Sequence, residues 1–136
     1  LQQPLKDAIA GGLPVLGSCA GMVLLARDIL DGLAGQQTLD TIPMTVRRNA
    51  FGRQVDSSEV DLTWQPDGTA MHATFIRAPW VESHADDVEV LATADHHGGK
   101  AVAVRYGHCV ATAFHPELTS DQRVHALFLE TVRERR

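Results

Sequence analysis

The chain begins and ends in segments with helical periodicity. In residues 1–12, LQQPLKDAIAGG, the apolar residues that share one helical face are Leu1, Leu5, Ala8 and Ile9. Two glycines then end the segment, as is common after a helix. In residues 120–136, SDQRVHALFLETVRERR, the residues on the apolar face are Val124, Leu127, Phe128 and Val132. Thr119 and Gln122 have the spacing of a capping box ahead of that face. The pattern predicts a helix at each end.

Between these segments the apolar runs are short and separated by turns such as Asp67-Gly68 and Gly98-Gly99. A buried strand is predicted for LPVLG at residues 13–17, followed by a helix over CAGMVLLARDIL at 19–30. Further strands are predicted in TIPMTV (41–46), RQVDSSEV (53–60), MHATFI (71–76), VEVLAT (88–93), KAVAVRY (100–106) and CVATAF (109–114). The initial order of helix, strand and helix predicts an α/β fold with a mostly parallel sheet.

Such sheets usually begin with a strand, so we expect the first strands and helices of the domain to lie upstream of Leu1. Residues 1–136 then form a single, N-terminally truncated domain. The composition agrees with one globular domain, since 44% of the residues are hydrophobic, 21% are charged and no tract is biased.

Charge and cysteine usage narrow the function classes. The formal charge is −5, and Lys and Arg cluster nowhere except at Arg133, Arg135 and Arg136, which argues against a nucleic-acid or membrane-surface partner. No apolar stretch approaches the roughly 20 residues of a membrane span, and no signal peptide is recognisable, so we expect a cytoplasmic protein. Cys19 and Cys109 are far apart in the sequence, which suggests neither a disulfide framework nor a zinc ribbon.

The first candidate for chemistry is Cys19, within Gly17-Ser18-Cys19-Ala20-Gly21. This is a Gly-x-Cys-x-Gly turn between a predicted strand and a predicted helix, the thiol form of a nucleophile elbow. Such a turn exposes the central side chain at a helix N-terminus and places the Ala20 N–H to bind an oxyanion. The alternative is a structural cysteine packed beside glycines. Cys109 has no such turn, and we expect it to be a small core residue.

A thiolate nucleophile needs a base, and of the seven histidines His115 has the most suitable neighbour. In ATAFHPEL, His115 and Glu117 are two residues apart at the end of an apolar strand, which puts both side chains on one face. With Cys19 they form a Cys-His-Glu pattern typical of nucleophilic catalysis. A histidine at a strand end beside a solvated glutamate is the alternative interpretation.

Together these motifs resemble the class I glutamine amidotransferases, which combine this elbow with a downstream His-Pro-Glu. TVRRNAFGRQVDSSE at residues 45–59 and FIRAPWVE at 75–82 narrow the resemblance to the glutaminase subunits of pyridoxal 5′-phosphate synthase. The resemblance implies the three-layer fold of that class. It also implies that Cys19 attacks the side-chain amide of L-glutamine, with His115 as acid and base and Glu117 orienting it.

The same resemblance places Arg48 and the Ile76-Arg77 pair at the glutamine site. An arginine suits the substrate's α-carboxylate, and a backbone pair can hold its amino group. Without the family, Arg48 would be part of a solvated loop and Arg77 a charge at a strand end. The implied partner is the pyridoxal 5′-phosphate synthase subunit, a (β/α)₈ barrel that receives the ammonia within a large hetero-oligomer. We expect no cofactor and no metal ion.

The chain departs from the family in one respect, because it lacks the Gly-Gly-Glu-Ser segment that supplies a second oxyanion donor. We therefore expect little glutaminase activity from residues 1–136 alone. Two other functions stay open. One is a glutaminase subunit of another synthase, such as imidazole glycerol phosphate synthase, and the other is a non-catalytic module that docks on a synthase.

Overall fold

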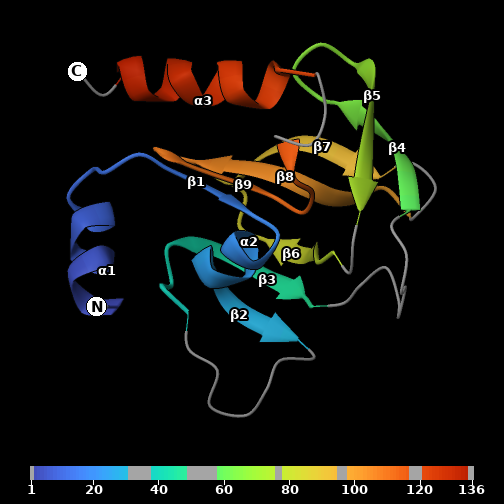
Figure 1. Ribbon diagram of the computed structural model, residues 1–136. Coiled ribbons are helices and arrows are strands. Elements are labelled where there is room, and N and C mark those ends of the chain that lie inside the picture. Colours follow the sequence, from blue (N-terminus) through green and yellow to red (C-terminus); the bar gives the residue numbers. More distant parts are fainter. Residues whose placement is uncertain are drawn as a thin grey trace.

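The computed structural model describes residues 2–30, 38–48, 58–75, 78–94, 98–116 and 121–134. Within these residues, one sheet of nine strands is accompanied by three helices (Figure 1). The elements follow in the order α1 (Gln2–Ala10), β1 (Val15–Ser18), α2 (Ala20–Leu25), β2 (Ala26–Leu30), β3 (Ile42–Arg47), β4 (Ser58–Trp64), β5 (Thr69–Phe75), β6 (Trp80–His84), β7 (Glu89–Ala94), β8 (Lys100–Tyr106), β9 (Cys109–Thr112) and α3 (Arg123–Glu134).

The strand order is β2-β3-β6-β8-β7-β4-β5, and β9 pairs with both β8 and β1. Between the described strands, β1 with β9 and β2 with β3 are parallel, and the other six pairings are antiparallel. The α/β class is confirmed, but the prediction of a mostly parallel sheet is wrong for these strands. Short turns such as the one through Gly107 join successive strands, and a short connection allows only antiparallel pairing.

The predicted helix over residues 19–30 is half the expected length. Helix α2 ends at Leu25, and Ala26 has an extended backbone, with φ −69° and ψ 156°. Ala26–Leu30 then forms β2, which pairs in parallel with β3. Residues 26–30 combine apolar and charged side chains that are compatible with either structure, and pairing with β3 decides in favour of a strand. The sequence predicts no strand at β6, where the structure buries only Val81 of the five residues.

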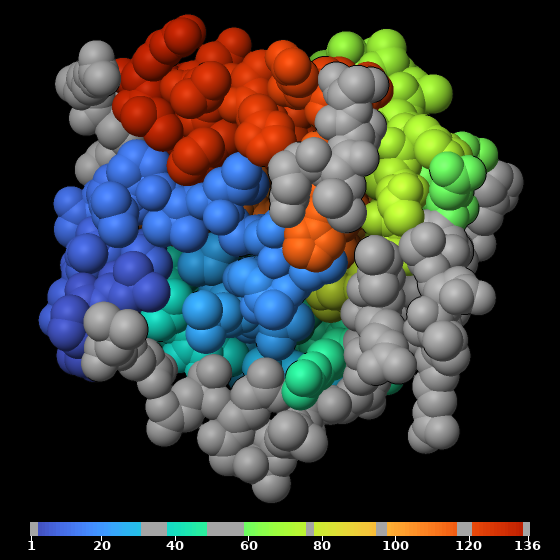
Figure 2. All heavy atoms as spheres, in the orientation of Figure 1, coloured from blue at the N-terminus to red at the C-terminus, as the bar shows by residue number. Residues whose placement is uncertain are grey.

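The two terminal helices lie where the sequence predicts them, but they differ in burial. On α3, Val124 is buried, and Leu127 and Phe128 pack partly buried against the core. On α1, Ile9 is buried while Leu5 and Ala8 are exposed, so the predicted apolar face is covered only at Ile9 within the described part of the helix. Figure 2 shows α3 in red across the top of the molecule, directly above N-terminal residues in blue.

The core is continuous through the middle of the sheet. All four residues of β9 are buried, and so are four consecutive residues of β8, Ala101–Val104. Helix α2 contacts β1 and β9 and, at its other end, β2. In Figure 1, α3 and α2 are drawn on opposite sides of the strands β1, β8 and β9. None of the helices in the described residues has the length and apolar character needed to cross a membrane.

The close contact between β1 and α2 depends on Gly17. A Cβ atom at Gly17 would lie 2.9 Å from the backbone C and O atoms of Gly21 and 2.9 Å from Cδ1 of Leu25. A Cβ atom at Gly21 would meet nothing within 4 Å. The absent side chain of Gly17 therefore allows the first turn of α2 to lie against the strand.

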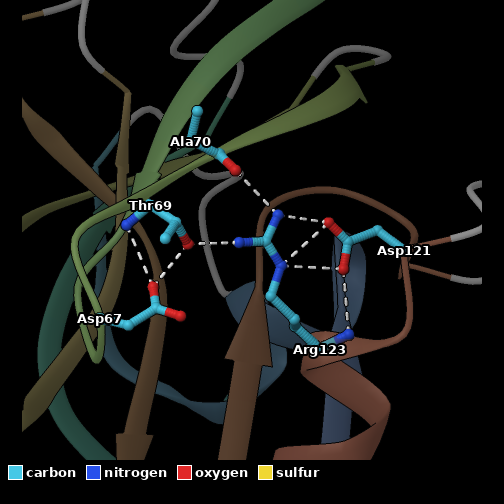
Figure 3. Close-up of polar contacts among 5 residues, drawn as sticks. All are labelled: Asp67, Thr69, Ala70, Asp121 and Arg123. Carbon is cyan, nitrogen blue, oxygen red and sulfur yellow. Dashed lines mark hydrogen bonds and ion pairs between the residues drawn. The ribbon is translucent and has the colours of Figure 1, made fainter.

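The start of α3 is tied to the β4–β5 hairpin by Arg123 (Figure 3). Its guanidinium donates to both carboxylate oxygens of Asp121, at 2.6–3.1 Å, to Oγ1 of Thr69 at 2.7 Å, and to the carbonyl of Ala70 at 2.9 Å. Asp121 also accepts the backbone N–H of Arg123 at 3.0 Å, while Thr119 of the predicted capping box lies outside the described residues. Hydrogen bonding to Arg123 lowers the pKa of Asp121 below its usual value.

We predict that Gly17→Ala lowers the free energy of unfolding by roughly 1–3 kcal/mol, because backbone atoms of Gly21 must move to admit the new methyl group. Gly21→Ala is the matched control. It should leave stability unchanged or raise it, since alanine is favoured over glycine in a helix by about 1 kcal/mol. Urea denaturation of both variants measures the difference, and equal stability of the two would contradict the packing argument.

We predict that Arg123→Met lowers the free energy of unfolding by about 1–2 kcal/mol near pH 7. The folded-state pKa of Asp121 is lowered, so its stabilising pair is fully present above the unfolded carboxyl pKa of about 3.9 and is lost as the pH falls through the lower folded value. The gap between variant and wild type should therefore narrow in acid. Urea denaturation at pH 7 and pH 3, with Arg133→Met as control, tests this. A gap that is constant with pH would exclude the Asp121 contribution.

Candidate active site

Cys19 lies in the turn where β1 ends and α2 begins, which is the structural context that the sequence predicts. Its backbone has φ 50° and ψ −106°, a left-handed conformation that costs a non-glycine residue roughly 1–3 kcal/mol. The turn is held on both sides by backbone hydrogen bonds. The Cys19 N–H donates to the Thr112 carbonyl at 2.8 Å, and the Cys19 carbonyl accepts the Met22 N–H at 3.0 Å. The surrounding structure thus maintains the strained turn.

The thiol of Cys19 is partly exposed and donates to the carbonyl oxygen of Ala113 at 3.1 Å. Ala113 is two residues before the half-buried His115. The contact arises because β1 and β9 are parallel and in register from Val15 with Cys109 to Ser18 with Thr112. Both strands therefore end at the same edge of the sheet. The structure brings the elbow and the His115 segment to one edge of the sheet, and the catalytic roles of Cys19 and His115 stay predictions.

The segment between β9 and His115 is fixed by three contacts. Oγ1 of the buried Thr112 donates to the carbonyl of Phe114 at 2.7 Å, and the Ala113 N–H donates to the carbonyl of Val102 at 2.8 Å. The ring of Phe114 stacks on Phe75 with centroids 5.7 Å apart. Sequence reasoning missed these supports. The available signal was that Phe114 and Phe75 directly precede the predicted site residues His115 and Ile76.

Arg48 is half-buried and follows directly after β3. Its N–H donates to the carbonyl of Leu30 at 3.2 Å, which joins it to the end of β2. The antiparallel register of β3 with β6 sets Arg47 opposite Trp80, so Arg48 lies beside the chain that enters β6. Strands β6 and β9 both pair with β8, at Ala101 and at Ala103–Tyr106, and β3 and β1 pair with them in turn. Arg48 and Cys19 therefore follow strands on different branches of the sheet.

Three of the predicted site residues, Glu117, Ile76 and Arg77, lie outside the described residues. Ala20 is the first residue of α2, so its N–H has no acceptor within the helix. That is the position required of an oxyanion donor, and the role itself stays a prediction.

Cys109 provides the contrast with Cys19. Its side chain is 1% exposed within β9, and burial raises its pKa to about 11. The thiol is therefore almost entirely protonated at neutral pH and shielded from reagents. Neither cysteine forms a disulfide. The prediction that Cys109 is a core residue is confirmed.

Comparison with known proteins identifies the family. Residues 1–134 match the model of the SNO glutamine amidotransferase family. The chain is 59% identical to the pyridoxal 5′-phosphate synthase subunit PdxT of Parafrankia sp. over 98% of its length, which corresponds to 64% of that protein. It is 60% identical to the PdxT subunit of Mycobacteroides abscessus, again over 98% of its length and over 67% of that protein. The chain thus spans about two thirds of the length of these relatives.

A solved structure agrees with the sequence comparisons. The crystal structure of a glutamine amidotransferase superposes with a TM-score of 0.83 at 41% identity, covering 97% of this chain and 68% of that one. The elbow at Cys19, its contact with the His115 segment, the matched family model and the shared fold lead to one conclusion: the chain belongs to the SNO glutamine amidotransferase family.

Proposed function

We propose that the protein is a glutaminase that hydrolyses L-glutamine to L-glutamate and ammonia. The observation that carries the proposal is the strained turn that presents Cys19, with its thiol 3.1 Å from the carbonyl of Ala113, two residues before His115. A nucleophile and a candidate base at one edge of a sheet are the parts that an amide-cleaving thiol enzyme requires. Family membership and the names of the relatives support the same activity.

In the first half of the reaction, the Cys19 sulfur forms a bond to the side-chain amide carbon of glutamine. The developing oxyanion is stabilised by the Ala20 N–H. His115 takes the thiol proton and gives it to the amide nitrogen, so that the C–N bond breaks and ammonia leaves. A glutamyl thioester on Cys19 remains.

In the second half, His115 removes a proton from water, which attacks the thioester carbon. The C–S bond breaks, glutamate leaves and Cys19 recovers its proton. Glu117 orients the His115 ring, in the role that a carboxylate has in related triads. Arg48 pairs with the α-carboxylate of glutamine, and the backbone of Ile76 and Arg77 holds its α-amino group.

The proposed acceptor of the ammonia is the pyridoxal 5′-phosphate synthase subunit, with the two proteins forming a large hetero-oligomer in the cytoplasm. Ammonia is protonated and lost in water at neutral pH, so transfer inside a complex preserves it. Both relatives compared above are named as subunits of that synthase, which favours it over the imidazole glycerol phosphate alternative. The remaining alternative, a non-catalytic docking module, would release no glutamate in the assays described below.

We predict that a diazoketone analogue of glutamine alkylates Cys19 and not Cys109. Cys19 is partly exposed at the proposed site, whereas the Cys109 thiol is buried and its pKa is raised to about 11. Peptide mass spectrometry after labelling in the presence of the synthase subunit locates the adduct. Cys109→Ala should label like the wild type, Cys19→Ala should not label, and excess glutamine should slow the reaction. Labelling that glutamine leaves unchanged would contradict a glutamine site.

We predict that Cys19→Ala abolishes glutamate release, because no thioester can form. His115→Asn should be nearly as damaging, and Glu117→Gln less so, since the orientation of the base is lost while the base itself remains. Coupled glutamate detection on the full-length protein, with the synthase subunit present, measures the rates, and Cys109→Ala serves as the control. Wild-type turnover by Cys19→Ala would overturn the proposed function, and wild-type turnover by His115→Asn would assign the base elsewhere.

A further inference from the structure

The sheet consists of two parts that meet at a narrow junction. Strands β2, β3 and β6 form one part, and β8, β7, β4 and β5, with β9 and β1, form the other. Between the described residues of the two parts, the register contains one pair, Val81 of β6 with Ala101 of β8. Strand β8, by comparison, pairs with β7 at five positions and with β9 at four. Within the sheet, the described backbone pairing between β6 and β8 (Figure 1) is therefore short.

Side chains reinforce the junction beside the Val81–Ala101 pair. Nζ of Lys100, on β8, lies 3.4 Å from Oε2 of Glu82 on β6. The same ammonium lies 5.8 Å from the centre of the Trp80 ring, within the range of a cation–π interaction. Nε1 of Trp80 donates to Oε2 of Glu82 at 2.8 Å. Trp80 and Glu82 of β6 thus both contact the ammonium group of Lys100 on β8.

Glu82 also contacts the strand that leads to Arg48. Nη2 of Arg47, the last residue of β3, donates to Oε1 of Glu82 at 3.3 Å. One carboxylate therefore connects β3, β6 and β8. The hydrogen bond from Trp80, and further those from Arg47 and Lys100, lower its pKa, because donors and positive charges favour the ionised group.

The two parts of the sheet carry different halves of the proposed site. Cys19 and His115 follow β1 and β9, whereas Arg48 follows β3. We propose that Glu82 is a positioning residue, whose contacts with Arg47, Trp80 and Lys100 hold Arg48 in register with Cys19. This inference rests on the proposed glutaminase function, since it assigns Glu82 a role in binding the substrate of that reaction.

The test compares the kinetics of Glu82 variants with those of a matched ion pair elsewhere. Glu82→Leu removes all three contacts, and Glu82→Gln keeps an acceptor for Trp80 while losing the charge. We expect the glutamine KM to rise about threefold to tenfold in Glu82→Leu and less in Glu82→Gln, with kcat within about twofold of the wild type. Glutamate release with the synthase subunit present supplies both constants.

Glu89→Leu is the matched control. Glu89 pairs with Arg105 at 2.7 Å between β7 and β8, so this ion pair also crosses two strands but lies within one part of the sheet. We expect Glu89→Leu to leave KM and kcat within about twofold of the wild type, while urea denaturation shows losses of stability similar to those of Glu82→Leu. A purely structural role of Glu82 would move stability and leave KM unchanged.

A double-mutant cycle with Arg48→Ala shows whether Glu82 acts through Arg48. If it does, Glu82→Leu adds nothing to the KM increase of Arg48→Ala. Independent, multiplicative increases would overturn the inference, as would an unchanged KM or a fall in kcat alone in Glu82→Leu. These outcomes require an active wild-type enzyme. A full-length wild type that releases no glutamate with the synthase subunit present overturns the proposed function, and this inference with it.

Discussion

The parallel pairing of β1 with β9 is the interaction on which the candidate site depends. Four residue pairs hold the strands together, and the hydrogen bond from the Cys19 N–H to Thr112 continues the pairing beyond β1. Because parallel strands end at the same edge, the turn after β1 and the segment after β9 come together, although 94 positions separate Cys19 from Ala113. Without this pairing, two distant motifs would share no site.

The pairing also supports the strained backbone at Cys19. A positive φ at a non-glycine residue persists only where the surroundings favour it, and here the strand, the first turn of α2 and the close approach at Gly17 do so together. The result is a thiol that the fold holds at the surface of the core. Cys109, the first residue of the buried strand β9, experiences the opposite environment. The two cysteines therefore differ in exposure because Cys19 lies in a turn between strand and helix, whereas Cys109 lies in a buried strand.

The sheet divides the proposed chemistry between two regions. The core strands β8 and β9 are buried and pair extensively, which suits a nucleophile and base that must keep a fixed distance. The part that carries Arg48 joins them through a short register and a cluster of charged and aromatic side chains. The residue proposed to bind the substrate, Arg48, thus follows a part of the sheet that pairs with the core strands at one described residue pair.

The sequence by itself determined the local features of the chain, those that depend only on residues close to one another in the sequence. Gly17-Ser18-Cys19-Ala20-Gly21 requires a tight turn, and the terminal helices follow from local periodicity. Tertiary structure alone decided that Ala26–Leu30 is a strand, that the strands pair mostly antiparallel, and that the Ala113 carbonyl meets the Cys19 thiol. The reason is that an apolar segment indicates burial but does not specify which other segment it pairs with. The partner that buries it lies far along the chain, and only the folded sheet selects it.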